Sequence, residues 1–247
     1  MIGHAAGERT IPERVAAILT GVAAAFVLVA VAVLLFLNPV WVSFEQGRTH
    51  AAELTGFADA DLRAATDAIL HDLVIGPPDF AVAVGGVPVL EERERAHMRD
   101  VRAVFGGFFL IAGVMAVGLT VLVAGARRAG HSERAWSAVA TAMRWLTVGV
   151  VAAGVIAAVA FDQLFELFHE LFFPAGTFLF DPRTDRLVQL FPFEFWSETT
   201  IVLGVVIVIA ATVISIGAGR RARRATADRR AGGAATPAVA PRVEAAR

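Results

Sequence analysis

Polar side chains return at helical spacing in one otherwise apolar stretch, residues 161–174 (FDQLFELFHELFFP). Because residues three and four positions apart share one face of a helix, Asp162, Glu166 and His169 form a polar stripe among Leu and Phe side chains. An imidazole, whose pKa lies near neutrality, could carry protons on such a helix close to lipid. The alternative is a surface-lying anchor whose polar face meets water.

A second histidine, His97, lies in the charged stretch 91–102, which leads into another apolar run. Glu94 and Asp100 are each three positions away, so both can border its face. His97 and His169 are about six and eight residues from their apolar runs, or roughly 10 Å above the hydrocarbon at about 1.5 Å per residue. Two imidazoles at one level, each near carboxylates, indicate a shared proton-transfer or metal site. Coincidence of solvated charges is the alternative.

The composition is that of a membrane protein. Of 247 residues, 57% are hydrophobic and 18% are charged, and the mean hydropathy of +0.65 is too high for an ordinary soluble domain. There is no cysteine, which excludes a disulfide, a thiolate metal site and a cysteine nucleophile. All 22 basic residues are arginine, which excludes a lysine Schiff base or a Ser-Lys mechanism.

Four apolar runs are long enough to cross a bilayer, which takes about 20 residues. The expected spans are residues 15–37, 103–126, 139–161 and 199–219. In the third span, the 17 residues from Trp145 to Phe161 rise by about 26 Å, so Arg144 can extend to the headgroups. The sequence therefore predicts an all-α integral membrane protein with four transmembrane helices.

Charge alternates between the segments that flank these spans. Arginines gather at residues 1–14, 127–138 and 220–247, whereas 38–102 and 162–198 are net acidic. Because positively charged flanks stay in the cytoplasm, both termini are expected inside and the two large connections outside. The predicted location is the cell's inner (cytoplasmic) membrane, with any site between the connections facing outward. The Gly/Ala/Pro-rich tail is expected to be disordered.

The 38–102 insertion is expected to form an extracytoplasmic helical cap. Residues 59–73 place apolar side chains on one side of an amphipathic helix. Residues 80–90 alternate weakly around Gly85-Gly86, a pattern compatible with a short hairpin. His50 and His71 of this insertion are expected to be ordinary surface or packing residues. The 162–198 connection is expected to be an amphipathic segment followed by a loop.

The two histidine-bearing stretches resemble the bacterial lipoprotein intramolecular transacylase family of four-span membrane proteins. Residues 92–102 (ERERAHMRDVR) are similar to the family's E-x-x-H-M-x-D-V pattern. The second matching block is 161–174, which continues through 176–185 to the Leu-Phe-Pro at 190–192. The shared topology covers residues 15–219.

The resemblance implies an acyltransferase that moves the sn-2 acyl chain of a diacylglyceryl-cysteine to the α-amine of the same residue, giving a lyso-form lipoprotein. Because ester-to-amide transfer is downhill, no nucleotide, acyl carrier or other cofactor is implied, and no metal. Its partners would be diacylglyceryl-modified lipoproteins in a phospholipid membrane, and no nucleic acid. The implied catalytic residues are His97 and His169, with supporting carboxylates from Glu94, Asp100, Asp162 and Glu166. Arg183 or Arg186 could steady an oxyanion.

Two other functions stay open at this stage. A metal-assisted hydrolase would use both histidines and a carboxylate as ligands, but His169-Glu170 is followed by Phe173 where an H-E-x-x-H helix has its second histidine. A non-catalytic membrane scaffold would use its outer cap to bind an envelope partner. Metal content distinguishes the hydrolase, and lipid analysis of lipoprotein N-termini distinguishes an enzyme from a scaffold.

Overall fold

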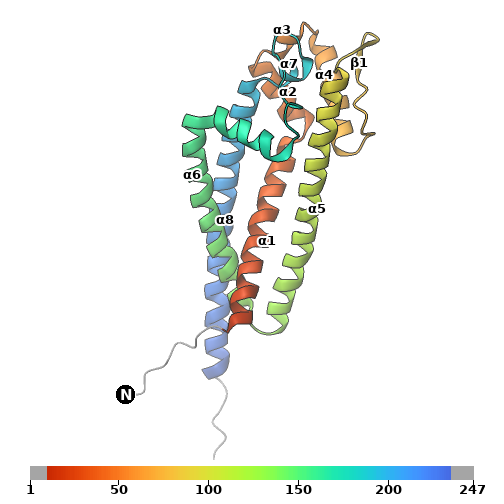
Figure 1. Cartoon of the computed structure of the whole chain (residues 1–247). Coiled ribbons are helices and arrows are strands. Elements are labelled where there is room, and N and C mark those ends of the chain that lie inside the picture. The colour runs from red at the N-terminus through yellow and green to blue at the C-terminus, as the bar shows by residue number, and fades with distance from the viewer. Residues whose placement is uncertain (1–9, 235–247) are drawn as a thin grey trace, which may run out of the picture.

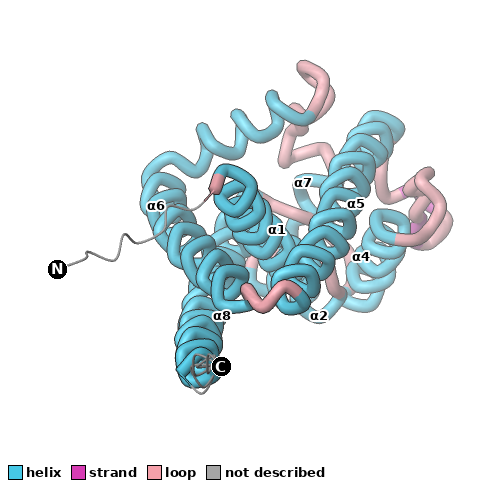
Figure 2. Tube along the Cα trace, turned by 90° about the horizontal axis from the view of Figure 1, so that it is seen from below, coloured by secondary structure: helices cyan, strands magenta, loops and turns pink. Residues whose placement is uncertain are grey.

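The computed structural model describes residues 10–234. Four long helices run side by side: α1 (Ile11–Phe36), α5 (Glu92–Arg128), α6 (Ser132–Phe172) and α8 (Phe193–Ala234) (Figure 1). Each is long and apolar enough to cross a membrane. Seen along the bundle, α1 lies at the centre and contacts α5, α6 and α8 (Figure 2). The predicted fold class, an all-α integral membrane protein with four spans and a helical cap, is confirmed.

The helices extend past the apolar runs that mark the spans. α5 begins at Glu92 and continues as one helix into its apolar run. α8 continues to Ala234, so the prediction of a disordered tail from residue 220 is wrong for 220–234. The physical reason is composition, because this segment is rich in Ala and Arg, both strong helix formers. The rest of the predicted disordered tail, 235–247, lies outside the described residues.

The cap gathers at one end of the bundle (Figure 1). It contains α2 (Pro39–Arg48), α3 (Ala51–Thr55), α4 (Asp59–Val74), the strands β1 (Ala83–Val84) and β2 (Val87–Pro88), and α7 (Arg186–Leu190). These elements share a hydrophobic core that includes the fully buried Phe80, Ile69 and Leu190. Because α7 packs on α3, the two polar connections form one cap.

Two local predictions for the cap are confirmed. The amphipathic segment 59–73 is α4, with Leu62, Ile69 and Leu73 buried. The hairpin pairs β1 with β2 in antiparallel register, and its two turn residues, Gly85 and Gly86, both have positive φ (57° and 81°). A two-residue hairpin turn of this kind needs that backbone, which glycine adopts without strain.

Small residues bring three of the membrane helices together. A Cβ on Gly21 of α1 would lie 2.9 Å from that of Ala142 on α6, so only glycine allows this approach. The Ser215 hydroxyl of α8 donates a hydrogen bond to the Ala140 carbonyl of α6 at 3.0 Å. Close backbone approach and interhelical hydrogen bonds are what hold helices together in lipid, where apolar burial gives little driving force.

α6 changes direction near its end. Ala160 has a non-helical backbone (φ −143°, ψ 35°), and the segment after it turns away from α8 and runs across the capped end toward α5. The segment 161–172 therefore leaves the bundle and carries His169 toward the helix that bears His97.

Candidate active site

His97 and His169 face each other at the capped end of the bundle. Their ring centroids are 6.0 Å apart and the ring planes differ by 20°. His97 comes from α5, below the cap, and His169 comes from the segment of α6 that follows the kink. The structure thus brings together the two histidines that the sequence places in one layer.

His97 is buried, with 5% of its surface exposed. Its ring lies against Phe173 and Phe180, with centroids at 4.7 and 5.5 Å. Burial lowers the pKa of His97 to about 4; nearby His169 lowers it further, and Asp100 acts in the opposite sense. His97 is therefore neutral at pH 7. Within residues 10–234 its buried Nδ1 has no hydrogen-bond partner, so this nitrogen is available to a substrate.

His169 is only partly buried, and one of its nitrogens is engaged. Its Nδ1 lies 2.7 Å from the carbonyl oxygen of Phe165. A carbonyl only accepts hydrogen bonds, so Nδ1 carries the proton. In the neutral ring, Nε2 is then left with a lone pair that can accept a proton.

Phenylalanines form the walls around the pair. Phe173 contacts both rings, at 4.7 Å from His97 and 5.4 Å from His169. Further phenylalanines near His169 are Phe165, Phe168 and Phe178. An apolar enclosure strengthens electrostatic interactions within it, because little water screens them. Sequence reasoning treated these residues as apolar cover, although the density of Phe after residue 160 was a usable signal.

Glu94 does not orient His97. It is 1% exposed, and both carboxylate oxygens accept backbone hydrogen bonds, Oε2 from Glu91 N at 2.7 Å and Oε1 from Leu187 N at 2.6 Å. Burial raises the pKa of Glu94, and the two N–H donors oppose that rise. Glu94 therefore caps α5 and joins it to α7.

The other three predicted carboxylates differ in position. Asp100 is partly buried, and its charge favours the protonated form of His97. Asp162 and Glu166 are exposed. Across residues 10–234, neither forms a hydrogen bond or ion pair with His169, whose Nδ1 bonds to the Phe165 carbonyl instead.

Arg93 is a positioning residue that sequence reasoning missed. Its guanidinium donates to Asp185 Oδ2 at 2.7 Å and to the Leu179 carbonyl at 3.0 Å. It also lies 4.9 Å from the ring centre of Phe180. These contacts hold the loop before α7 against α5 and fix Phe180 over His97. The signal, an arginine beside the E-x-x-H motif, was present in the sequence.

The two arginines considered for an oxyanion are engaged elsewhere. Arg183 is exposed and pairs with Asp181 at 3.3 Å. Arg186 donates to the Thr55 carbonyl at 2.6 Å and to Gln189 Oε1 at 2.8 Å. Arg186 thus connects α7 to the end of α3, and both side chains serve the cap.

Of the described residues, no group of three or more His, Asp or Glu side chains is arranged to hold a metal ion. The two histidines face each other within phenylalanines, and the carboxylate of Glu94 is engaged by two backbone N–H groups. Nothing in this arrangement favours the metal-assisted hydrolase.

Two imidazoles that face each other within phenylalanines, at one end of four membrane-spanning helices, define the candidate site of an integral membrane protein. The family model described as lipoprotein intramolecular transacylase Lit matches residues 18–196, and the chain belongs to this enzyme family.

Solved structures show the same fold. The in meso structure of Lit from Bacillus cereus superposes with a TM-score of 0.70 at 17% identity, covering 89% of this chain and 98% of that one. A variant of that protein with one histidine replaced by arginine gives 0.69, also at 17% identity, covering 90% and 95%. A second variant, with alanine at that histidine, gives 0.70 at 17% identity, covering 89% and 96%. No curated protein matches the chain.

Proposed function

We propose that this protein transfers the sn-2 acyl chain of a diacylglyceryl-modified lipoprotein to the α-amine of the lipidated cysteine. The observation that carries the proposal is the stacked pair of His97 and His169 within phenylalanines, in a chain of the transacylase family. Acyl transfer needs the proton movements that such a pair can perform. Neither the metal-assisted hydrolase nor the scaffold has an observation in its favour.

The chemistry requires one proton to move from nitrogen to oxygen. The amine nitrogen forms a bond to the ester carbonyl carbon, the bond from that carbon to the glycerol oxygen breaks, and the amine proton ends on this oxygen. His169 is suited to accept and return the proton, because its Nε2 keeps a lone pair while Nδ1 is held by Phe165. A base near its working pH typically contributes about 10² to 10⁴ in rate.

His97 has a different task in this proposal. Its burial keeps the ring neutral, so it is a poor base but can donate a hydrogen bond from a ring N–H. The carbonyl oxygen becomes negative in the tetrahedral intermediate, and a preorganised donor in an apolar site stabilises that charge. The two histidines thus divide the work, His169 for the proton and His97 for the oxyanion.

The surroundings suit a lipid-linked substrate. Beside His169, the segment after the α6 kink exposes Leu167 and Leu171, the latter to 73%. Exposed apolar side chains on a helix that leaves the bundle are stable in contact with acyl chains. A diacylglyceryl group could therefore reach the pair from the lipid side, with its ester at the level of the imidazoles.

The proposed orientation places this site outside the inner membrane, with both termini in the cytoplasm. It is supported by the arginines at the far ends of α5 and α8. The chain has no native cysteine, so single cysteines report position directly. Cysteine in place of Asp67 should be labelled from outside by an impermeant reagent, and cysteine in place of Arg223 should not. Outside labelling at 223 would reverse the topology.

The function is tested by mass spectrometry of one lipoprotein N-terminus from cells with and without this protein. Expression should convert a diacylglyceryl-cysteine into its N-acyl lyso form with no change in total acyl chains. His169→Ala, at equal abundance in the membrane, should abolish the conversion. An unchanged N-terminus under wild-type expression would refute the transacylase and leave the scaffold.

A further inference from the structure

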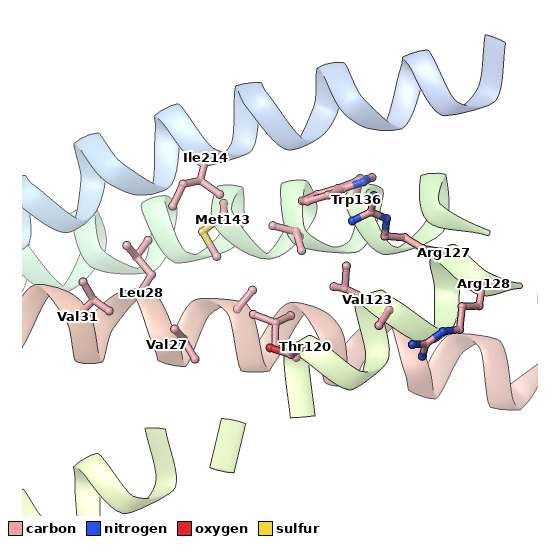
Figure 3. Close-up of a pocket in the computed structure, with 14 residues that line it drawn as sticks. Val27, Leu28, Val31, Thr120, Val123, Arg127, Arg128, Trp136, Met143 and Ile214 are labelled. Carbon is pink, nitrogen blue, oxygen red and sulfur yellow. The ribbon is translucent and has the colours of Figure 1, made fainter. Parts of the chain in front are cut away.

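A cavity of about 780 Å³ extends along the bundle from the end opposite the histidine pair. It opens between α1, α5 and α6, and its walls include Val27, Leu28, Val31, Val123 and Met143 (Figure 3). Its volume falls within the roughly 300 to 1,000 Å³ of sites that take small ligands. These walls belong to the membrane-spanning parts of the helices, so the cavity lies at the depth of the lipid hydrocarbon.

Two arginines stand at one end of this apolar cavity. Arg127 and Arg128 line it at the end of α5, while Val31 lies at the opposite end (Figure 3). Trp136 of α6 lies at the arginine end and stacks under the guanidinium of Arg221 at 5.0 Å. Tryptophan and arginine together mark the level of the lipid headgroups.

Two acidic side chains at this end are already paired. Glu13 of α1 pairs with Arg134, and Glu133 pairs with Arg229. Within residues 10–234, no carboxylate lies within 4.0 Å of Arg127 or Arg128. The cavity mouth therefore keeps two adjacent positive charges that the protein does not neutralise.

We propose that this cavity binds an anionic phospholipid, with one acyl chain between α1, α5 and α6 and its phosphate at Arg127 and Arg128. The charge at the mouth selects the occupant, because the walls alone would accept any acyl chain. Basic pockets between membrane helices are recognised sites for acidic headgroups. The α1 wall rises about 10 Å from Ala24 to Val31 and leads away from the arginines, so it would hold the distal half of an acyl chain.

The site is separate from the proposed acyl transfer, since its arginines lie at the other end of the bundle and it shares no residue with the histidine enclosure. Its occupant would be a structural lipid that fills a gap between α1 and α5 and fixes the spacing of the two helices. Transfer activity and lipid retention can therefore be measured independently.

Native mass spectrometry of the full chain in neutral detergent tests the proposal, with phosphatidylglycerol and phosphatidylcholine of identical acyl chains as probes. Wild type should bind phosphatidylglycerol preferentially. Arg127→Gln with Arg128→Gln should weaken that binding on the order of thirtyfold, as expected for two basic residues at an acidic headgroup. Thr120→Phe, which fills the cavity beneath intact arginines, should weaken it as well.

The matched control is Arg220→Gln with Arg224→Gln. It removes the same charge from the same end of the bundle, at exposed positions of α8 outside the cavity. This control should retain the wild-type preference. Three results would each overturn the proposal: equal binding of both lipids by wild type, full binding by the Arg127/Arg128 variant, or an equal loss in the control.

Discussion

The two walls that hold the histidines are built differently. The α5 wall is embedded in the cap, where His97 is buried, Glu94 accepts two backbone hydrogen bonds and Arg93 is bound to the loop before α7. The α6 wall lies beyond a kink, and His169 is fixed by one hydrogen bond to its own helix. The difference suggests a division between a wall held by protein and a wall that lies in lipid.

This contrast has a consequence for stability. A substitution on the α5 wall removes contacts between distant parts of the cap, so it should change both stability and activity. A substitution on the α6 wall removes few tertiary contacts, so it should change activity alone. Four predictions test this contrast, ordered from the largest expected effect.

Replacing either histidine should have the largest effect on transfer. His169→Ala and His97→Ala should each lower the rate by about 10² to 10⁴, measured as N-acyl lyso-lipoprotein formed by equal amounts of protein. Glutamine separates the two tasks, since its amide donates a hydrogen bond but is no base. His97→Gln should therefore recover part of the activity, and His169→Gln should not.

His50→Ala and His71→Ala are the controls, because both side chains are exposed beside local acids in the cap. They should match wild type. Recovery of activity in His169→Gln but not in His97→Gln would mean that His97 is the proton acceptor and His169 stabilises the oxyanion.

Glu94 and Glu166 offer a matched pair, as each is a carboxylate three residues before a histidine. Glu94→Ala should lower the free energy of unfolding by about 2 to 4 kcal/mol, because the buried N–H of Leu187 and the partly buried N–H of Glu91 lose their acceptor. The cost is roughly 1 to 3 kcal/mol for a fully buried group and less for a partly buried one. Glu166→Ala should change it by less than about 0.5 kcal/mol, as for other exposed sites. Denaturation in a detergent that keeps the protein active measures both; equal effects would remove the distinction between the walls.

The pH dependence of stability should report the burial of His97. Its pKa of about 4 lies below the usual value near 6.5, so the unfolded chain binds a proton that the folded chain refuses between these values. The contribution of neutral His97 to the free energy of unfolding is fully present above pH 6.5 and is lost as the pH falls through 4. The total loss is roughly 3 kcal/mol. Wild type should lose more stability than His97→Gln over this window. If the free energies of unfolding of wild type and His97→Gln changed equally with pH, His97 would not be buried as a neutral group.

The sequence could predict those features of the site that depend on residues close together in the chain. The level of His97 and His169 follows from residue counts to the nearest apolar run, and α4 and the hairpin follow from short patterns. The contacts Arg93–Asp185 and Glu94–Leu187 join positions 92 and 93 residues apart, and no local period encodes them.

The α6 kink was beyond sequence reasoning for a different reason. Ala160 is neither proline nor glycine, and alanine favours helix. The segment 161–172 was therefore placed correctly as an amphipathic helix, but its turn across the bundle end toward α5 had no signal in the residue types. Asp162 and Glu166 were assigned to the site from their helical spacing to His169, and both side chains are exposed.

The smallest effect is expected where the cap meets α8. Glu45 of α2 is 1% exposed, its Oε1 has no hydrogen-bond partner within residues 10–234, and Arg48 lies at 4.0 Å while binding Glu198 at 2.8 Å. Burial, together with the neighbouring Glu198, raises the pKa of Glu45 to about 7. The folded chain thus holds a proton that the unfolded chain releases, and this stabilising contribution is lost as pH rises from about 4.5 through 7.

Glu45→Gln should remove the loss of stability that follows ionisation of Glu45, because the amide is neutral at every pH. The variant should be more stable than wild type at pH 8 by about 1 kcal/mol, since Arg48 offsets part of the buried charge, and the gain should vanish near pH 4.5. Transfer activity should stay at the wild-type level, because Glu45 supports the cap and contacts neither histidine. Thermal unfolding at the two pH values, with lipoprotein conversion on the same preparations, measures both. A gain in stability accompanied by lost transfer would mean that the ionised carboxylate of Glu45 serves the reaction, and the site would then extend from the two histidines to the place where α2 meets α8.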